Sequence, residues 1–599
     1  MKRLKNLSLF KIALLIALNL VVKSSVLLIL SLIYLLISDY KQSIIFISIF
    51  ILILLTNTIN NDFIKYGVVE SKEDKYVIVD KVLYKTKVYD NDLEVGDFVK
   101  FNDSSELDVN DYDLKHNIKY TYSNDVDKLF SFHLKKYVNN RINSLDNKSS
   151  SYIKRIVLND YSNNNDIEDI GYGFSFYYLL MLIRRKNHKV ANILTFIYII
   201  LFSFEIKLYL VVIDMILSFF DLTRINKLSI KLLLILLINK NLIFNYSIIV
   251  SLLLSLYYMT DLKKDRSYIA IIQSLLFGEV QLFTLFFFNY LIYLRIFVFI
   301  LSFLTILIPG LSSIYVIIIE FISLILKYIN FGVRGKINIH ILLIIFILFK
   351  VLKVNNQFNK IACILLILIT PISNPFKHVT FINVGQGDSA LIKGELNKYN
   401  VLIDTGSTWN YSKLKKELIN QGIYKLDYLI ISHSDNDHSG NIDNLLKDFK
   451  INEIVTVGKD IELNNESLKY IYLGTYENDN DNSLVYELTI DDYKFLFTGD
   501  ISKKVENKLL DYEEDIDVLK VSHHGSNTAT SNYFVGRLNP KFGIISTSGA
   551  YNHPSKEVID NLEAYYVKIF NTIVDGSITF YFTDLIDFIK TGMNEFVII

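Results

Sequence analysis

The chain has 599 residues, too many for one hydrophobic core, so several domains are expected. Hydrophobic residues make up 51% of it, with 41 Phe and 40 Tyr, and the mean hydropathy is +0.32, which fits a membrane protein joined to soluble parts better than a wholly soluble enzyme. The 62 basic and 62 acidic residues cancel, so bulk charge predicts no partner, and the single Cys363 excludes a disulfide framework and a thiolate zinc site.

The first part, residues 1–58, is almost continuously apolar after the basic start Met1-Lys-Arg-Leu-Lys5. A signal peptide would be followed by soluble sequence, whereas here apolar sequence continues. We therefore predict two or three N-terminal transmembrane helices, with the basic tip in the cytoplasm.

Residues 61–124 change to short β-rich runs bounded by turns, and they predict a small β-barrel domain with an OB-like fold. Such folds can bind single-stranded nucleic acid through aromatic and basic side chains. The same alternation of Tyr and Lys is also typical of any exposed sheet, so both interpretations stay open. The candidate residues are Tyr76, Tyr84, Lys85, Lys87, Phe98 and Lys100.

A polar and helical linker is expected over 125–173, followed over 174–373 by apolar segments separated by short charged loops. A bilayer core requires about 20 apolar residues per helix, so this region predicts roughly seven to nine spans in an α-helical bundle. Ionisable residues at membrane depth usually face a pathway or a partner, unless they lie at the interface. Those within the apolar runs are Asp214, Glu279, Arg295 and Glu320.

Two prolines, Pro371 and Pro375, mark the boundary of a last domain, 376–599. In it, an apolar strand ends at Ile431 and is followed by Ser432-His-Ser-Asp-Asn-Asp-His438. Imidazole and carboxylate ligands suit Zn²⁺ or Mn²⁺, and one compact loop can divide its ligands between two ions.

A two-ion site also needs a bridging carboxylate and a further imidazole from later strands. Lys494-Phe-Leu-Phe-Thr-Gly-Asp500 offers the carboxylate, and Asp517-Val-Leu-Lys-Val-Ser-His-His-Gly-Ser526 offers the imidazole. Two divalent ions about 3.5–4 Å apart suit the in-line displacement at phosphorus. The sequence therefore predicts a metal-dependent phosphoester hydrolase.

These motifs resemble the metallo-β-lactamase superfamily. Val384-Gly-Gln-Gly-Asp388, Asn480-Asp-Asn-Ser-Leu-Val485 and Tyr551-Asn-His-Pro-Ser555 narrow the resemblance to the ComEC/Rec2 family of DNA internalization competence proteins, and the order of the domains matches as well. The resemblance implies an αββα sandwich with two divalent metal ions, Mn or Zn, at one edge of its sheets.

Matched by position, the resemblance assigns His433 and Asp435 to a first metal, Asp437 and His438 to a second, and Asp500 to both. His523 would complete the second metal because it directly follows its strand, with His524 as the alternative. Asp437, His438 and Asp500 would carry the catalysis. The residues expected to orient ligands or surround the site are Asp388, Asp404, Asn482, Ser483 and His553.

Two departures from the family pattern stand out. Asp435 occupies the position of the usual second histidine, and Asn482-Ser483 falls where a further histidine often stands, which leaves the first metal with few imidazoles and favours Mn²⁺. In the membrane part, Ser175 takes the place of a histidine that the family carries near its first core helix.

The implied function is a multi-pass DNA uptake channel of the cell membrane that passes single-stranded DNA during natural transformation, while its nuclease domain degrades the other strand. Its partners would be DNA, the lipid bilayer and other competence proteins, with a homo-oligomer as a further option. Two alternatives stay open: a transport protein whose C-terminal domain is not catalytic, and a membrane-anchored metallohydrolase of another phosphoester.

Overall fold

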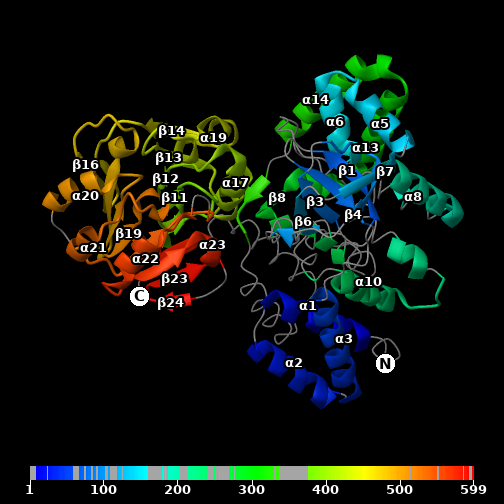
Figure 1. Ribbon diagram of the computed structural model, residues 1–599, viewed down its shortest axis with the longest axis horizontal. Helices are drawn as coiled ribbons and strands as arrows, with labels where there is room; N and C mark the ends of the chain where they lie inside the picture. The colour runs from blue at the N-terminus through cyan, green and yellow to red at the C-terminus, as the bar shows by residue number, and fades with distance from the viewer. Residues whose placement is uncertain are drawn as a thin grey trace. The chain divides into compact units, whose positions relative to one another are not determined.

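The computed structural model divides into two compact units, Met1–Tyr268 with Leu282–Phe331, and Ile269–Gln281 with Gly332–Ile599 (Figure 1). We take each unit separately. The residues that the structure describes are 8–22, 25–38, 40–58, 66–72, 76–81, 85–89, 92–101, 106–107, 118–123, 126–131, 133–158, 179–180, 182–183, 186–202, 212–217, 219–238, 240, 248–249, 252–253, 269–270, 273–274, 277–329, 332–336, 376–512, 515–549, 552–583, 586–592 and 596–599.

The first unit begins with three apolar helices, α1 (Ser8–Val22), α2 (Ser25–Ser38) and α3 (Tyr40–Thr58). They share a buried cluster with α10 (Arg224–Ile238), in which Ile16, Phe46 and Leu236 are almost fully buried. This packing agrees with the N-terminal helices that the sequence predicts.

A seven-stranded sheet follows in the order β5-β6-β3-β2-β1-β4-β7. One face of it is apolar and includes Val69, Val77, Val79, Val88 and Val99. Closure of this sheet into an OB-like barrel stays a prediction. The strands are β1 (Tyr66–Lys72), β2 (Val77–Asp80), β3 (Lys85–Tyr89), β4 (Asp97–Phe101), β5 (Glu106–Leu107), β6 (Ile118–Ser123) and β7 (Val126–Ser131).

Several candidate nucleic-acid residues lie in this sheet. Phe98 stacks on Phe130, with ring centroids 4.8 Å apart, and Lys87 Nζ lies 4.2 Å from the centre of the Tyr76 ring. Lys85 pairs with Glu70, which offsets its charge. Tyr84 lies outside the described residues. Nucleic-acid binding by this sheet therefore stays a prediction.

The other described elements of this unit are helical: α5 (His133–Asn143), α6 (Asn147–Ile153), the π-helix η2 (Lys154–Leu158), α8 (His188–Phe202), α13 (Leu282–Leu307), the 3₁₀ turn η6 (Pro309–Leu311) and α14 (Ser312–Ile329). Among the described residues, two stretches of helix are long and apolar enough to cross a membrane, Tyr290–Leu307 and Pro309–Leu326. The larger number of spans stays a prediction, and Ser175, Cys363, Pro371 and Pro375 lie outside the described residues.

Two of the ionisable residues in the apolar runs have partners of opposite charge. Lys231 Nζ lies 2.6 Å from Asp214 Oδ2, and Lys148 Nζ lies 2.7 Å from Glu320 Oε1. Arg295 is buried in α13. Glu279 lies in the strand β8 (Glu279–Gln281), so of the two interpretations left open for these residues, a position at membrane depth within a helix does not hold for it. The reason is that its segment pairs with β9 (Gly332–Arg334) in a short ribbon of the second unit.

Most of the second unit is a sandwich of two mixed sheets with helices on both outer faces (Figure 1). The inner faces pack through residues such as Phe381, Phe495 and Phe580. Helices α17 (Tyr411–Asn420) and α19 (Ile442–Asp448) cover the first sheet, and α20 (Lys503–Leu509), α21 (Asn532–Leu538) and α22 (Lys556–Glu563) cover the second. The αββα sandwich is confirmed.

The first sheet has the order β14-β13-β12-β11-β10-β22-β23-β24 and the second β15-β16-β17-β18-β19-β20-β21. The first contains β10 (Lys377–Phe381), β11 (Ala390–Lys393), β12 (Asn400–Ile403), β13 (Lys425–Ile430), β14 (Lys450–Val455), β22 (Ile578–Phe582), β23 (Phe588–Thr591) and β24 (Phe596–Ile598). The second contains β15 (Ile461–Leu463), β16 (Glu466–Ile471), β17 (Val485–Ile490), β18 (Tyr493–Phe497), β19 (Val518–Lys520), β20 (Phe542–Ile545) and β21 (Lys568–Asn571).

Strand direction brings the polar motifs to one edge. β12 and β13 run parallel, as do β18, β19 and β20, so their carboxyl ends lie at the same edge of each sheet. Asp404, His433, Asp500 and His524 follow β12, β13, β18 and β19 respectively. Buried parallel strands therefore place residues far apart in sequence beside one another.

Candidate metal centre

The centre of the site is a buried group of four ligand-type residues, Asp388, His438, Asp500 and His524. Each offers one nitrogen or oxygen, and these four atoms all lie within 4.8 Å of one another. His438 Nε2 is 3.3 Å from Asp500 Oδ1, and His524 Nε2 is 3.4 Å from Asp500 Oδ2. Asp500 thus lies between two imidazoles that come from different sheets.

Asp437 extends this group toward solvent. Its Oδ2 lies 3.2 Å from His524 Nε2, and its side chain is 29% exposed. Asp437 therefore forms a partly exposed side of a group whose other members are buried.

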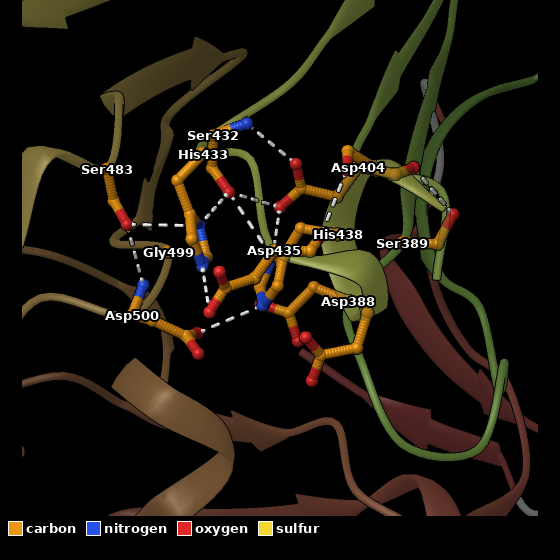
Figure 2. A network of polar contacts seen from close by, with 12 residues as sticks. Asp388, Ser389, Asp404, Ser432, His433, Asp435, His438, Ser483, Gly499 and Asp500 are labelled. Carbon is orange, nitrogen blue, oxygen red and sulfur yellow. Dashed lines mark hydrogen bonds and ion pairs between the residues drawn. The ribbon is translucent and has the colours of Figure 1, made fainter. Parts of the chain in front are cut away.

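A second group surrounds His433. Its ring centroid lies 4.1 Å from that of His438, and its Nε2 lies 3.6 Å from Asp435 Oδ2 (Figure 2). Asp435 is half exposed, whereas His433 is buried. Ser483, at the position where a histidine could stand, lies 3.3 Å from His433 Nδ1 and accepts a hydrogen bond from Asp500 N at 3.1 Å. This half of the site has fewer nitrogen ligands than the half around His438.

The pair His523-His524 forms a tight turn after β19 in which both residues have positive φ, 50° and 55°. His524 is buried and points into the centre, with its Nδ1 held 3.0 Å from Ser546 O. His523 is 29% exposed, its Nε2 is 3.8 Å from Asp500 Oδ2, and its Nδ1 meets Thr528 Oγ1 at 3.1 Å. The geometry favours His524, the alternative of the two, as the ligand.

Asp404 fixes the orientation of His438, as Figure 2 shows. Its Oδ2 lies 2.8 Å from His438 Nδ1, and it accepts hydrogen bonds from Ser432 N at 2.7 Å and Ser432 Oγ at 2.8 Å. A carboxylate on Nδ1 keeps a proton there and leaves Nε2 directed at Asp500. Asp404 itself adopts a φ of 59°, which aspartate tolerates better than most residues.

Asp388 connects the centre to a buried lysine that the sequence interpretation did not assign. Lys520 Nζ lies 2.6 Å from Asp388 Oδ2, and Asp388 Oδ1 lies 3.2 Å from His524 Nδ1. The sequence signal that could have identified Lys520 is its position as a single cation in the buried strand Asp517-Val-Leu-Lys-Val521. The pair borders a cavity of about 20 Å³, large enough for one water molecule.

Glycine lets the loops of the site approach one another. Gly387 has a φ of 110°, and a Cβ there would lie 2.1 Å from Asp437 O. No other residue fits this contact, which brings the Asp388 loop against the loop of Asp437.

Charges inside the centre shift several pKa values. Burial opposes the charge on His438, but Asp500 and Asp404 outweigh it and hold its pKa well above the usual range. Burial likewise opposes the charge on Asp500, but His438 and His524 outweigh it and hold its pKa well below the usual range. Burial and the neighbouring His438 lower the pKa of His433.

Two expected residues lie outside the centre. The Asn482 side chain bonds to the backbone of Tyr476 on both sides, accepting from its N at 2.8 Å and donating to its O at 2.8 Å. The ring centroid of His553 is 6.0 Å from that of His523. Asn482 therefore shapes the loop that carries Ser483, and His553 borders the exposed histidine.

The donor set fits divalent metal ions. His433 Nε2, His438 Nε2, His524 Nε2, Asp388 Oδ1 and Asp500 Oδ1 are buried and lack a hydrogen-bond partner within the protein. Buried polar atoms are normally paired, and imidazole with carboxylate is a ligand set for Zn²⁺ or Mn²⁺.

Comparison with known proteins agrees with this geometry. Residues 382–477 match the family model of the metallo-beta-lactamase superfamily. Three relatives are similar to this chain: ComE operon protein 3 of Bacillus subtilis (30% identical over 265 residues, covering 36% of this chain and 34% of the relative), Recombination protein 2 of Haemophilus influenzae (32% over 243, covering 36% and 30%) and Competence protein ComA of Neisseria gonorrhoeae (27% over 221, covering 34% and 32%). The matched stretch thus spans about a third of each relative's length.

Proposed function

We propose that this chain, a homologue of the ComEC-type competence proteins with a metallo-β-lactamase superfamily domain in its C-terminal part, is a DNA uptake protein with a metal-dependent phosphodiesterase domain. The observation that carries the enzymatic half is the buried group Asp388, His438, Asp500 and His524, which joins ligand atoms from both sheets. The relatives, named for competence and recombination, support DNA as the substrate.

Asp437, His438, Asp500 and His524 would hold one divalent ion, and His433, Asp435 and Asp500 the other. When bound, two such ions supply an activated water and balance the charge that develops on the phosphoryl oxygens. Asp404 keeps His438 in the tautomer that presents Nε2, and the carbonyl oxygen of Ser546 does the same for His524. The partly exposed Asp437 leaves the centre open to a phosphodiester on that side.

Metal content and cleavage test this proposal together. We expect the detergent-solubilised full chain to retain Mn²⁺ or Zn²⁺ and to cleave single-stranded DNA in a manner that chelation abolishes. Asp500→Asn should lower cleavage at least about 100-fold, because several kcal/mol of charge stabilisation depends on the ions it holds. The control is Asp443→Asn, an exposed acidic residue on α19.

Cleavage that survives both chelation and Asp500→Asn would refute the phosphodiesterase. Cleavage of small phosphodiesters alone, with no action on DNA, would instead indicate a hydrolase of another phosphoester.

For the whole protein, we propose a multi-pass location in the cell membrane, with passage of one strand while the other is degraded, aided by other competence proteins. The two apolar stretches Tyr290–Leu307 and Pro309–Leu326 support the membrane location. A strain that lacks the gene should lose transformation and regain it with the intact chain. If the Asp500→Asn variant also restores transformation, transport of DNA does not require degradation of the other strand.

One observation favours a second candidate, a transport protein whose C-terminal domain is not catalytic. The half of the site around His433 has Ser483 where an imidazole could stand, and its carboxylate Asp435 is half exposed. If the purified chain holds no divalent metal at physiological concentrations and cleaves no phosphodiester, the second candidate is correct.

A further inference from the structure

The chain's single tryptophan lies on the turn that follows β12. Trp409 is 91% exposed, in the 3₁₀ segment η9 (Thr408–Asn410). Indole offers the largest flat apolar surface of any side chain, and an exposed aromatic face is a ready surface for stacking.

The Trp409 turn is fastened to the loop that carries Asp435 and Asp437. Thr408 Oγ1 donates to Asn436 Oδ1 at 2.5 Å, and Asn441 Nδ2 donates to Ser407 O at 2.8 Å. Asn441 also donates to Thr405 O and Gly406 O, at 2.9 and 3.0 Å. The turn therefore keeps a fixed place relative to the metal-ligand loop, although the indole itself is exposed.

The same turn also borders the glycine loop that leads into Asp388. Asn410 Nδ2 lies 2.9 Å from the position that a Cβ on Gly385 would take, and Lys413 Nζ lies 3.5 Å from that position. Lys413 is in the first turn of α17, directly after the Trp409 turn. The turn that carries the indole thus adjoins the two loops that hold the candidate ligands, and the Lys413 ammonium lies beside one of them.

We propose that Trp409 and Lys413 form the site that receives a nucleotide of single-stranded DNA next to the scissile phosphodiester, with the base on the indole and a phosphate near the ammonium. This proposal rests on the proposed phosphodiesterase function. Stacking on an aromatic ring needs an unpaired base with a free face, so the pair selects single strands over duplex without reading sequence. Lysine contributes a point charge for the backbone phosphate.

The test uses the fluorescence of Trp409, which is the only tryptophan in the chain. In chelator, where no cleavage occurs, oligothymidylate is titrated into the full chain in detergent while tryptophan fluorescence is followed. We expect saturable quenching by the single strand and much weaker quenching by a blunt duplex of equal length. Quenching by anionic lipid vesicles without DNA, or equal quenching by duplex and single strand, overturns the proposal.

Kinetics with metal give a second readout. Because one stacked base contributes ~1–3 kcal/mol, Trp409→Ala should raise KM for the oligonucleotide roughly 5–150-fold with little change in kcat, and Trp409→Phe should restore most of the affinity. Tyr566→Ala is the matched control, since Tyr566 is 95% exposed but lies before β21 of the second sheet, at the amino ends of its parallel strands and not at the carboxyl ends, where the site lies.

An unchanged KM in Trp409→Ala, with wild-type cleavage intact, overturns the proposal and leaves the phosphodiesterase standing. Loss of cleavage in the wild type refutes the phosphodiesterase, while the quenching experiment still reports whether the indole meets a base.

Discussion

At the scale of single residues, the site depends on which of two neighbouring histidines turns inward. The left-handed backbone at His523 and His524 is costly for both, about 1–3 kcal/mol each, and such conformations persist where the surroundings enforce them. The turn packs on Pro554, since a Cβ on Gly525 would lie 2.7 Å from Pro554 Cβ. Within the turn, the hydrogen bond from His524 Nδ1 to Ser546 O holds that ring in the centre, whereas His523 meets Thr528 at the rim.

The two histidines can be compared with one substitution that suits the backbone of both. Asparagine tolerates positive φ, so His524→Asn and His523→Asn should fold alike. We expect His524→Asn to lose at least half of the bound metal and His523→Asn to keep it, as measured by elemental analysis of the purified chains. The reverse result would make His523 the ligand.

At the scale of secondary-structure elements, the β8–β9 ribbon is part of the second unit, which we call the hydrolase unit after its proposed function, although the ribbon comes from the range 174–373. Arg334 anchors it: the guanidinium lies 4.7 Å from the centre of the Phe449 ring and donates to Ile423 O and Asp448 O at 3.0 and 3.3 Å. Lys336 N donates to Asn420 O at 3.0 Å. The ribbon thus adds to the fold of the hydrolase instead of serving as a free linker.

Loss of the Arg334 contacts should destabilise the hydrolase unit. Because two hydrogen bonds and a cation–π contact are lost, we expect Arg334→Ala to lower the free energy of unfolding of the hydrolase unit by about 1–3 kcal/mol. Arg334→Lys should restore little of this stability, because lysine lacks the planar guanidinium group. Urea unfolding of the full chain, followed by limited proteolysis, measures this. Lys450→Ala, an exposed neighbour on β14, is the control, and equal stability of all three variants would contradict the anchoring role.

A second element-scale feature is Glu506 on α20, which is fully buried and accepts hydrogen bonds from Thr530 N and Ser531 N. Burial raises its pKa to about 7, despite these bonds. The folded state then binds this proton more tightly than the unfolded state. The contribution to stability is complete below pH 4.5 and is lost as the pH rises through 7.

The stability of the hydrolase unit should therefore fall between pH 4.5 and 7, by up to about 3 kcal/mol from this group. Glu506→Gln should flatten this slope, because glutamine cannot titrate. Urea midpoints across the pH range measure the effect. If the dependence of stability on pH is unchanged in the variant, groups other than Glu506 cause it.

At the scale of the whole molecule, chain connectivity limits the topology. α13 leaves directly from β8, α14 returns directly to β9, and the tight turn Pro309–Leu311 joins them. If each helix crosses the bilayer once, the ribbon and the hydrolase unit lie on the same side and Gly310 lies on the other.

Cysteine labelling can test this arrangement, because the chain has only Cys363 to replace. In a Cys363→Ala background, Gly310→Cys and Lys450→Cys should react with a membrane-impermeant maleimide from opposite sides of the membrane. The Gly310 position is open, with nothing within 4 Å of an added Cβ. Labelling of both from one side would exclude two crossings by α13 and α14.

The αββα fold of the last domain was implied by the family that its motifs resemble. The sequence by itself determined most of the candidate ligands, because each motif directly follows an apolar strand and strand direction then fixes its edge. His433, His438 and Asp500 were identifiable in this way. The alternation of apolar strands and polar motifs is a local property of the sequence, so it can be recognised without knowledge of the rest of the fold.

Only the tertiary structure decided which histidine turns inward, that Asp388 lies beside the ligand group and pairs with Lys520, and that a ribbon from the range 174–373 belongs to the hydrolase unit. Each of these depends on contacts between segments distant in the chain: His524 on Ser546, strand β19 beside the Asp388 loop, and Arg334 on Phe449. Such contacts follow from packing of the two sheets and their loops, and no local pattern of polar and apolar residues encodes them.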